Sequence, residues 1–515
     1  MTMVESSAPG AWRLRRLPEA AAGLAAGLWL VLLWAWPNAA FYLSFDDSFY
    51  YFEIARNLAA GLGPTFDRLN PTNGFHPLWL AIATLPYLGG LDGLTAVRVL
   101  LGLGVVLWGA TLVMIVGRLR GPGAGTLALV TLLLGANPYV IKTFANGLES
   151  ALYALLLAAL VGRSLAVGGD WIGGASRRQR LIAGALGAVA FLARTDAIFA
   201  LAALALTVAP GALRKRRPMA LVELFALPAA VVVVFLAANA IVFGTPMQVS
   251  GTVKRLPLGP LAIALFIGLT LVLAGAAWWL ARRAERVPLP RTVALLRSAP
   301  WFPLACGMIL GYYVALQSFP RLWHFAPVVL LGVALFLALT ADLAGLAGPS
   351  RRLLAVILAG PLAVAAVLHG LRLADPATVA ARLADRRAAE WIAVHLPAEA
   401  VLGSWDAGIL GYFTPQRVIN LDGVVNSPAY AAALARGEAG ALVRAQGLAY
   451  LVNHDDTAGD RPRALPAMAG WLLGAETAGA MRLVKTWPFT FAGSSNRRAR
   501  GRHSMAVFLY ALPAD

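Results

Sequence analysis

Two adjacent aspartates, Asp46 and Asp47, stand directly after the first long apolar run, in the stretch FDDSFYYFEIARNL. An ionised carboxylate at a membrane surface is costly unless it has a partner or a function. A positioned carboxylate can act as a general base, and two together could hold a divalent cation through oxygen ligands. The structural alternative is that one of them caps the amphipathic interfacial helix that the following residues predict, although a cap needs only one aspartate. The pair therefore favours chemistry at this position.

Glu149 and His76 are further candidates, because both stand where an apolar segment begins. Glu149 lies in NGLES between two strongly apolar stretches, where a role in chemistry competes with electrostatic stabilisation of a helix N-terminus. His76 follows the Gly-, Pro- and Asn-rich loop GLGPTFDRLNPTNGF and precedes an apolar helix. It could bind a phosphate group or cap the turn.

Two later loops supply cations beside apolar segments. Lys254 and Arg255 end FGTPMQVSGTVKR, and Arg321 and His324 lie in SFPRLWHFAP. Lysine and arginine at an interface suit a lipid-linked phosphate, because a charged donor strengthens the hydrogen bond to an anion. Contact with ordinary lipid headgroups is the alternative for Lys254 and Arg255, and a snorkelling side chain is the alternative for Arg321.

The composition indicates where such residues act. Apolar residues make up 59% of the 515 positions and charged residues only 13%, which predicts a polytopic α-helical membrane protein. The net charge of +18 does not indicate nucleic acid, because the arginines fall in short clusters between apolar runs, as in cytoplasmic membrane loops. The single cysteine, Cys306, excludes an intrachain disulfide and a cysteine metal site.

Nine apolar runs are long enough to cross a bilayer, which needs roughly 20 residues. They cover residues 20–36, 94–117, 124–144, 150–167, 219–243, 258–281, 300–317, 323–343 and 353–373. Two more segments are too short or too broken, namely Pro77 to Gly89 and the pair of runs around LARTDA between Leu181 and Ala209. We expect juxtamembrane or half-membrane helices there, and about 9–11 transmembrane helices in total.

The basic clusters predict the orientation. Arginines at positions 13, 15 and 16 precede the first run, which places the N-terminus in the cytoplasm, and the later clusters fall in loops on the same side. The loops with the candidate residues then share the external face. A cleaved signal peptide with small residues at Ala39 and Ala40 is the alternative, but the many later spans disfavour it.

Residues 375–515 form a second domain by composition, after a membrane module of residues 1–374. Beyond His369, charged and turn residues increase and no run could span a membrane. Helical periodicity over Ala380 to Leu396 alternates with short apolar strands at residues 400–403, 418–421, 449–452 and 506–511. These features predict a soluble extracytoplasmic α/β domain.

The order of several motifs resembles the GT-C integral membrane glycosyltransferases over most of the chain. These motifs are FDDSFYYFEIARNLA, NPTNGFHPLW, NGLES, LARTDA, FGTPM and the terminal SWDAGILGYF and VINLDGVVN. The chain is similar to aminoarabinose transferases, protein O-mannosyltransferases and mycobacterial arabinofuranosyltransferases with a soluble external domain. The resemblance implies Asp47 as the catalytic aspartate with Asp46 beside it, and Glu149 as a second acidic position. His76 falls near a phosphate-binding lysine of the aminoarabinose transferases, so the sequence departs from that pattern here.

The resemblance implies a transferase of the bacterial inner membrane, which moves a hexose or pentose from a polyprenyl-phosphate donor to an envelope glycan, lipid or protein. Asp47 would accept the proton of the acceptor hydroxyl, and the cations named above, with His76, would stabilise the leaving phosphate. The chief alternative is a transporter or flippase of a lipid-linked substrate, although such proteins usually show paired halves and charges near the midplane. A catalytically silent scaffold that binds a partner is a third alternative.

Overall fold

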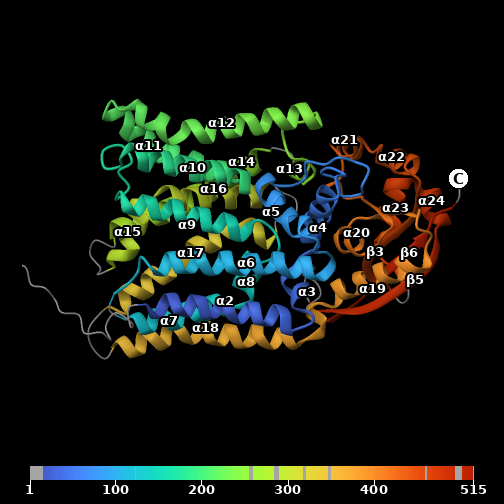
Figure 1. Cartoon of the computed structure of the whole chain (residues 1–515), viewed down its shortest axis with the longest axis horizontal. Coiled ribbons are helices and arrows are strands. Elements are labelled where there is room, and N and C mark those ends of the chain that lie inside the picture. The colour runs from blue at the N-terminus through green and yellow to red at the C-terminus, as the bar shows by residue number, and fades with distance from the viewer. Residues whose placement is uncertain are drawn as a thin grey trace, which may run out of the picture. The chain divides into compact units, whose positions relative to one another are not determined.

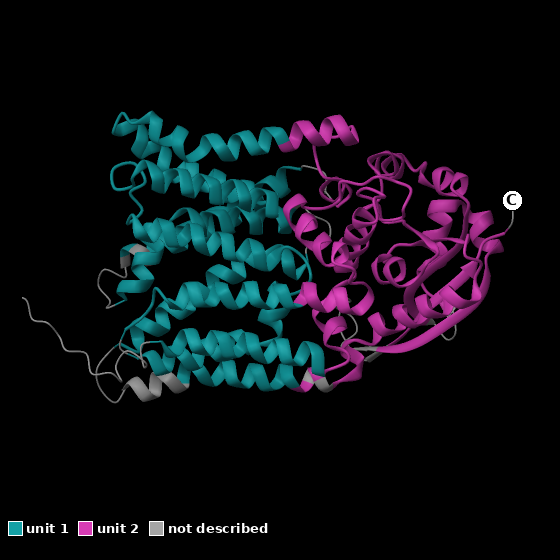
Figure 2. Ribbon diagram, in the orientation of Figure 1, with its two compact units in different colours: residues 1–35, 102–234, 256–370 teal, residues 36–101, 235–255, 371–515 magenta. Residues whose placement is uncertain are grey.

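The computed structural model describes residues 16–121, 123–254, 259–283, 289–316, 321–345, 350–458, 461–492 and 502–513. The chain divides into two compact units, each built from three separate segments (Figure 2). Unit 1 comprises residues 1–35, 102–234 and 256–370, and unit 2 comprises residues 36–101, 235–255 and 371–515. The C-terminal region thus shares a unit with the two segments that carry Asp46, Asp47, His76 and Lys254. The domain boundary at residue 375 stays a prediction.

Unit 1 consists of helices, as the apolar runs predict, because a helix satisfies all backbone hydrogen bonds within one segment of chain. It contains the greater parts of α6 (Gly93–Val116), α12 (Pro218–Phe243) and α18 (Ser350–Ala374) (Figure 1). Its other helices are α2 (Leu17–Ala35), α7 (Ala124–Ala136), α8 (Pro138–Phe144), α9 (Ser150–Ala166), α10 (Arg177–Ala193), α11 (Ala197–Arg214), α14 (Pro260–Arg283), α15 (Pro290–Ser298), α16 (Trp301–Leu316), η2 (Leu322–Phe325) and α17 (Ala326–Leu343).

The prediction of a multi-pass membrane protein is confirmed. Within the described ranges, six helices are long and apolar enough to cross a membrane: Leu17–Ala35, Gly93–Val116, Ala197–Arg214, Pro218–Phe243, Pro260–Trp279 and Leu322–Leu343. Two bent helix pairs raise the number to eight if each pair is one span. Shorter apolar helices cover Pro77–Leu88, Ser150–Ala166 and Ile357–Leu371. All nine predicted runs are therefore helical, although several are bent or short.

Two runs differ in form from the expectation. The run at 124–144 bends by 65° between α7 and α8. Pro138 has no backbone N–H, and the Asn137 side chain accepts the N–H groups of Tyr139 and Val140, which starts a new helix. The run after LARTDA was expected to be a half-membrane helix, but α11 has 18 residues and is long enough to span. The polar motif separates α10 from α11 without shortening the apolar sequence that follows.

Two of the arginine clusters, at the start of α10 and the end of α11, lie beside the ends of neighbouring helices of unit 1, as the one-sided distribution predicts for them. Lys215, after α11, pairs with Asp170 at 3.0 Å in the loop after α9. Arg180 of α10 pairs with Glu223 of α12 at 2.7 Å. The ends of four successive helices are therefore linked by ion pairs.

The C-terminal part of unit 2 is an α/β domain, as predicted. Its sheet has the strand order β2-β1-β3-β6-β5, with β4 paired to β3. Strand β1 is parallel to β2 and β3, whereas β6 is antiparallel to β3 and β5. The strands are β1 (Val401–Ser404), β2 (Arg417–Asn420), β3 (Leu448–Ala458), β4 (Arg461–Pro462), β5 (Arg482–Ala492) and β6 (Arg502–Ala511). The predicted strands correspond to β1, β2, β3 and β6, while β5, which contains Pro488 at the sheet edge, was missed.

Helices cover this sheet and also form the earlier segments of unit 2. They are α3 (Ala39–Leu43), α4 (Asp46–Ala59), α5 (Pro77–Leu88), α13 (Val249–Val253), η3 (Pro376–Thr378), α19 (Ala380–His395), α20 (Gly408–Phe413), α21 (Pro428–Arg436), α22 (Ala439–Ala445), α23 (Leu465–Leu473) and α24 (Ala475–Ala480). A buried cluster that includes Ile419, Tyr430, Val443, Leu451 and Leu472 packs α21, α22 and α23 against the sheet. Burial of these side chains fixes the loops that follow β1 and β2.

Candidate active site

Asp46 is the first residue of α4, and its carboxylate binds the start of another helix. Its two oxygens accept the backbone N–H groups of Gly408 and Ile409, each at 2.8 Å, where α20 begins. Such N–H groups have no partner inside their own helix and favour a negative charge nearby. Position 408 also requires glycine, because a Cβ there would lie 2.2 Å from the Asp46 carbonyl oxygen. Asp46 therefore joins α4 to the C-terminal domain.

Asp47 has a different partner. Its Oδ2 atom lies 3.6 Å from Nζ of Lys254, which directly follows α13. The side chains of Asp47 and Lys254 are 31% and 21% exposed, so a ligand can reach the pair. The structure thus brings the predicted catalytic aspartate beside one of the predicted cations. Arg255, the next residue, lies outside the described residues.

The loop that ends at His76 holds the segment of Lys254 in place. Asn73 accepts the N–H of Val249, the first residue of α13, through its Oδ1 atom at 3.0 Å. The Nε2 atom of Gln248 lies 3.2 Å from Nδ1 of His76. His76 therefore stands in the same unit as the ion pair and contacts the segment that carries its cation.

Asp422, in the motif INLDGVVN, lies near the same ion pair. Its loop packs on α13, because a Cβ on Gly423 would lie 3.5 Å from Cγ2 of Val253. Burial raises the pKa of Asp422 to about 7, while Lys254 opposes this rise and Asp47 adds to it. The motif predicted no specific role for Asp422. Its only signal was a single acid between apolar residues.

A second charged cluster of unit 2 lies around His454 of β3. Its Nε2 atom is 3.4 Å from Asp406, and its Nδ1 atom is 3.8 Å from Asp385. Burial disfavours the charged ring, but Asp406 and Asp385 outweigh burial and raise the pKa of His454 to about 10. Burial likewise raises the pKa of Asp46 to about 8, and the same two carboxylates contribute to that rise. The cluster was not predicted from the sequence, and it couples Asp46 to the sheet electrostatically.

Glu149 lies in unit 1, in a buried charged cluster centred on Arg194. The Arg194 side chain is 2% exposed, with Nη1 3.1 Å from Glu149 and Nε 2.8 Å from Asp196. It also donates to the carbonyl oxygen of Trp323 at 2.9 Å and to the hydroxyl of Tyr313 at 3.2 Å. Arg194 was not among the predicted site residues, although charged residues within an apolar stretch such as LARTDA are a signal of a paired or functional site.

Arg321 and His324 border this cluster. The His324 ring stacks on Tyr313 with ring centroids 4.2 Å apart, and its Nδ1 atom accepts the Arg321 N–H at 3.0 Å. The predicted site residues with described positions therefore fall into two groups. Unit 2 holds Asp46, Asp47, His76 and Lys254, and unit 1 holds Glu149, Arg321 and His324.

A divalent cation was considered for Asp46 and Asp47. Over the described ranges, no group of three or more His, Cys, Asp or Glu side chains could hold a metal ion. Both oxygens of Asp46 accept N–H groups of α20, and Asp47 faces Lys254. A cation shared by the two aspartates would compete with these contacts for the carboxylate oxygens.

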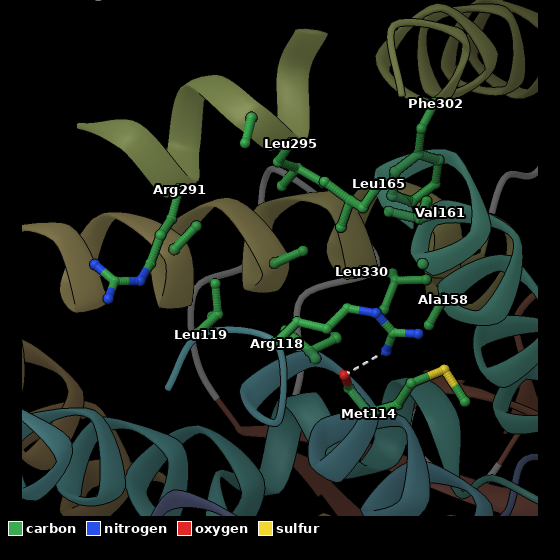
Figure 3. A pocket seen from close by; sticks show the side chains of 15 residues that line it. Met114, Arg118, Leu119, Ala158, Val161, Leu165, Arg291, Leu295, Phe302 and Leu330 are labelled. Atoms are coloured by element: carbon green, nitrogen blue, oxygen red, sulfur yellow. Dashed lines mark hydrogen bonds between the residues drawn. The ribbon is translucent and has the colours of Figure 1, made fainter. Parts of the chain in front are cut away.

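Unit 1 also contains a cavity of about 130 Å³ (Figure 3). Its lining is apolar apart from Arg118 and Arg291. Arg118 donates to the Met114 carbonyl oxygen at 2.7 Å, and Arg291 pairs with Asp342 at 3.3 Å. None of the candidate residues lines this cavity.

Comparison with solved structures identifies the fold. The apo crystal structure of the oligosaccharyltransferase of Archaeoglobus fulgidus, a GT-C glycosyltransferase, superimposes with a TM-score of 0.53 at 14% identity, over 91% of this chain and 73% of that chain. The chain has the GT-C fold. The predicted resemblance is thereby confirmed at the level of the fold, which consists of a helical membrane part and a C-terminal α/β domain.

The chain is also similar to a second solved structure and to one family model. ArnT from Cupriavidus metallidurans, bound to undecaprenyl phosphate, aligns with a TM-score of 0.49 at 15% identity, over 97% of this chain and 98% of that chain. Residues 376–508 match a family described as "Domain of unknown function (DUF8728)". No curated protein sequence matches the chain.

Proposed function

We propose that the protein is a membrane glycosyltransferase that uses a polyprenyl-phosphate sugar as donor and Asp47 as general base. The observation that supports this proposal is the ion pair of Asp47 and Lys254 in a chain with the GT-C fold. A base for the acceptor and a cation for the donor phosphate then stand side by side. The acceptor is an envelope glycan, lipid or protein.

The chemistry follows from the two charges. An acceptor hydroxyl has a pKa far above neutrality, so a carboxylate that takes its proton as the new C–O bond forms contributes about 10²–10⁴-fold. The bond between the anomeric carbon and the phosphate oxygen breaks in the same displacement, and polyprenyl phosphate leaves with an added negative charge. A cation beside that oxygen stabilises the charge more in the transition state than in the ground state. Asp47 takes the proton, and Lys254 stabilises the leaving group.

The other predicted residues keep their proposed roles. His76, Arg255, Arg321 and His324 are proposed to bind the donor phosphate, and Glu149 is proposed as a second acid of the site. We place the protein in the bacterial inner membrane, with the N-terminus in the cytoplasm and the Asp47 loop outside. The GT-C fold does not favour the transporter alternative.

Asp47→Asn tests the proposal, with Asp92→Asn as a matched control. Asp92 is also a partly exposed carboxylate of unit 2, and it lies 3.6 Å from a cation, Arg56, as Asp47 lies 3.6 Å from Lys254. We expect cells with Asp47→Asn to lose the same glycan or glycolipid sugar as cells without the protein, by mass spectrometry of the envelope. Cells with Asp92→Asn should keep it. Identical envelope sugars with and without the wild-type protein would contradict the proposal.

A further inference from the structure

The C-terminal domain reaches the candidate site at Tyr50, through the end of β2 and the loop after β1. The Tyr50 hydroxyl accepts the side-chain amide of Asn420, the last residue of β2, at 3.2 Å, and the N–H of Ala407, in the loop after β1, at 3.4 Å. Tyr50 stands three residues after Asp47 on α4, so their side chains lie on the same helix face. The loop that carries Asp422 is thus attached beside Asp47.

The Asp422 loop is closely packed and locally fixed. A Cβ on Gly74 would lie 2.2 Å from the carbonyl oxygen of Val424. Because glycine has no side chain, the backbone of the loop before His76 can pack directly against the backbone of the Asp422 loop. Gly423 has a φ of +83°, a left-handed conformation that favours glycine, and it turns the chain directly after Asp422. Asp422 accepts the Val424 N–H at 3.0 Å, which fixes its carboxyl group.

Several charged and titratable groups surround the Asp422 carboxyl. Lys254 at the end of α13 attracts it, and Asp47 of α4 repels it. The charge of Asp422 also contributes to the raised pKa of two buried phenols, Tyr50 of α4 and Tyr430 of α21. Lys254 is the cation of this group, and it is 3.6 Å from Asp47. A lysine that is attracted by two carboxylates has less freedom to move to solvent than a lysine attracted by one.

We propose that the C-terminal domain, which matches a family of unknown function, is part of the catalytic site and supplies Asp422 as a positioning residue that holds Lys254 beside Asp47. This inference rests on the proposed function. Helix α4 supplies the base, and the C-terminal domain fixes the place of the cation.

Asp422→Asn isolates the charge, because the amide oxygen can still accept the Val424 N–H. Asp375→Asn is the matched control, since Asp375 accepts the N–H two residues later at the same 3.0 Å in the same unit. With a donor that supports wild-type turnover, we expect kcat of Asp422→Asn to fall about tenfold, because Lys254 is then held less firmly beside the leaving phosphate. Asp422→Glu should restore part of kcat. The proposal is overturned if Asp422→Asn and Asp375→Asn have the same kcat.

A second measurement needs no substrate and therefore separates this inference from the proposed function. The unfolding free energies of Asp422→Asn, Lys254→Met and the double variant form a double-mutant cycle on the purified full chain. If Asp422 holds Lys254, the double variant should be more stable than the sum of the single effects predicts. Additive effects would reject the contact even if the wild type transfers sugar. A wild type without transferase activity that shows this coupling would reject only the proposed function.

Discussion

Two conservative substitutions of adjacent residues, Asp46→Asn and Asp47→Asn, should have opposite consequences. Asp46 binds the N-terminus of α20 through both oxygens, whereas Asp47 faces a partly exposed lysine. Asp46→Asn should therefore lower stability, and Asp47→Asn should lower activity. Each substitution keeps the size of the side chain, so each variant is a control for the other.

The structure sets the magnitude of the two effects. An asparagine has one oxygen, so at position 46 either Gly408 or Ile409 would lose the acceptor of its N–H and face an amide N–H₂ group instead. An unsatisfied buried donor costs about 1–3 kcal/mol. At about 2 kcal/mol, the ratio of folded to unfolded protein falls roughly 30-fold. The pair of Asp47 and Lys254 is half-exposed, so its loss costs about 0–1 kcal/mol, whereas loss of a general base lowers kcat by about 10²–10⁴-fold.

The effect at Asp46 should depend on pH. Burial, with Asp406 and Asp385, raises the pKa of Asp46 to about 8, above the ordinary value of 3.8. The folded state therefore keeps a proton that the unfolded state has lost, and the resulting stability disappears as the pH rises through about 8. Asparagine has no such proton. The difference in unfolding free energy between the wild type and Asp46→Asn should thus be larger at pH 5 than at pH 9.

Denaturant unfolding of the purified proteins at pH 5, 7 and 9 measures the stability of both variants, and donor consumption measures their activity. The reasoning is refuted if Asp47→Asn is the less stable variant, or if Asp46→Asn alone abolishes turnover at wild-type stability. Either result would mean that the contact of Asp46 with α20 does not hold the two segments together.

Three further predictions follow from the other charged contacts. Arg194→Met should cost about 4 kcal/mol in denaturant unfolding, because it leaves Glu149 and Asp196 buried without a cation, and adding Glu149→Gln should recover part of the loss. The stabilising effect of His454, measured against His454→Gln, should shrink as the pH rises from about 6.5 to about 10, because the neighbouring carboxylates outweigh burial in raising its folded-state pKa to about 10. Replacing Lys254 and Arg255 together by glutamine should raise KM for the polyprenyl-phosphate donor and leave acceptor affinity unchanged, as steady-state kinetics at fixed lipid composition can show.

The sequence by itself determined the class of the protein, because its signals are local. A run of about 20 apolar residues is costly anywhere but in a membrane or a large core, so each of the nine predicted runs is helical wherever its neighbours in space lie. Two of the arginine clusters likewise lie at neighbouring helix ends of unit 1, as expected of charge that a bilayer excludes. The aspartate pair after the first run was found for the same reason, since charge beside an apolar run needs no tertiary information to recognise.

Only the tertiary structure decided what each charged residue does. The carboxylate of Asp46 binds N–H groups that lie 362 and 363 positions later in the chain, and no local pattern shows that Asp47 is the one left beside Lys254. Arg194 and Asp422 were missed for this reason. The role of a single charge in an apolar stretch cannot be assigned until its partner is known. The packing of distant segments determines which residue becomes that partner. The energy of a buried charge depends on atoms within a few ångströms, whatever their separation in sequence.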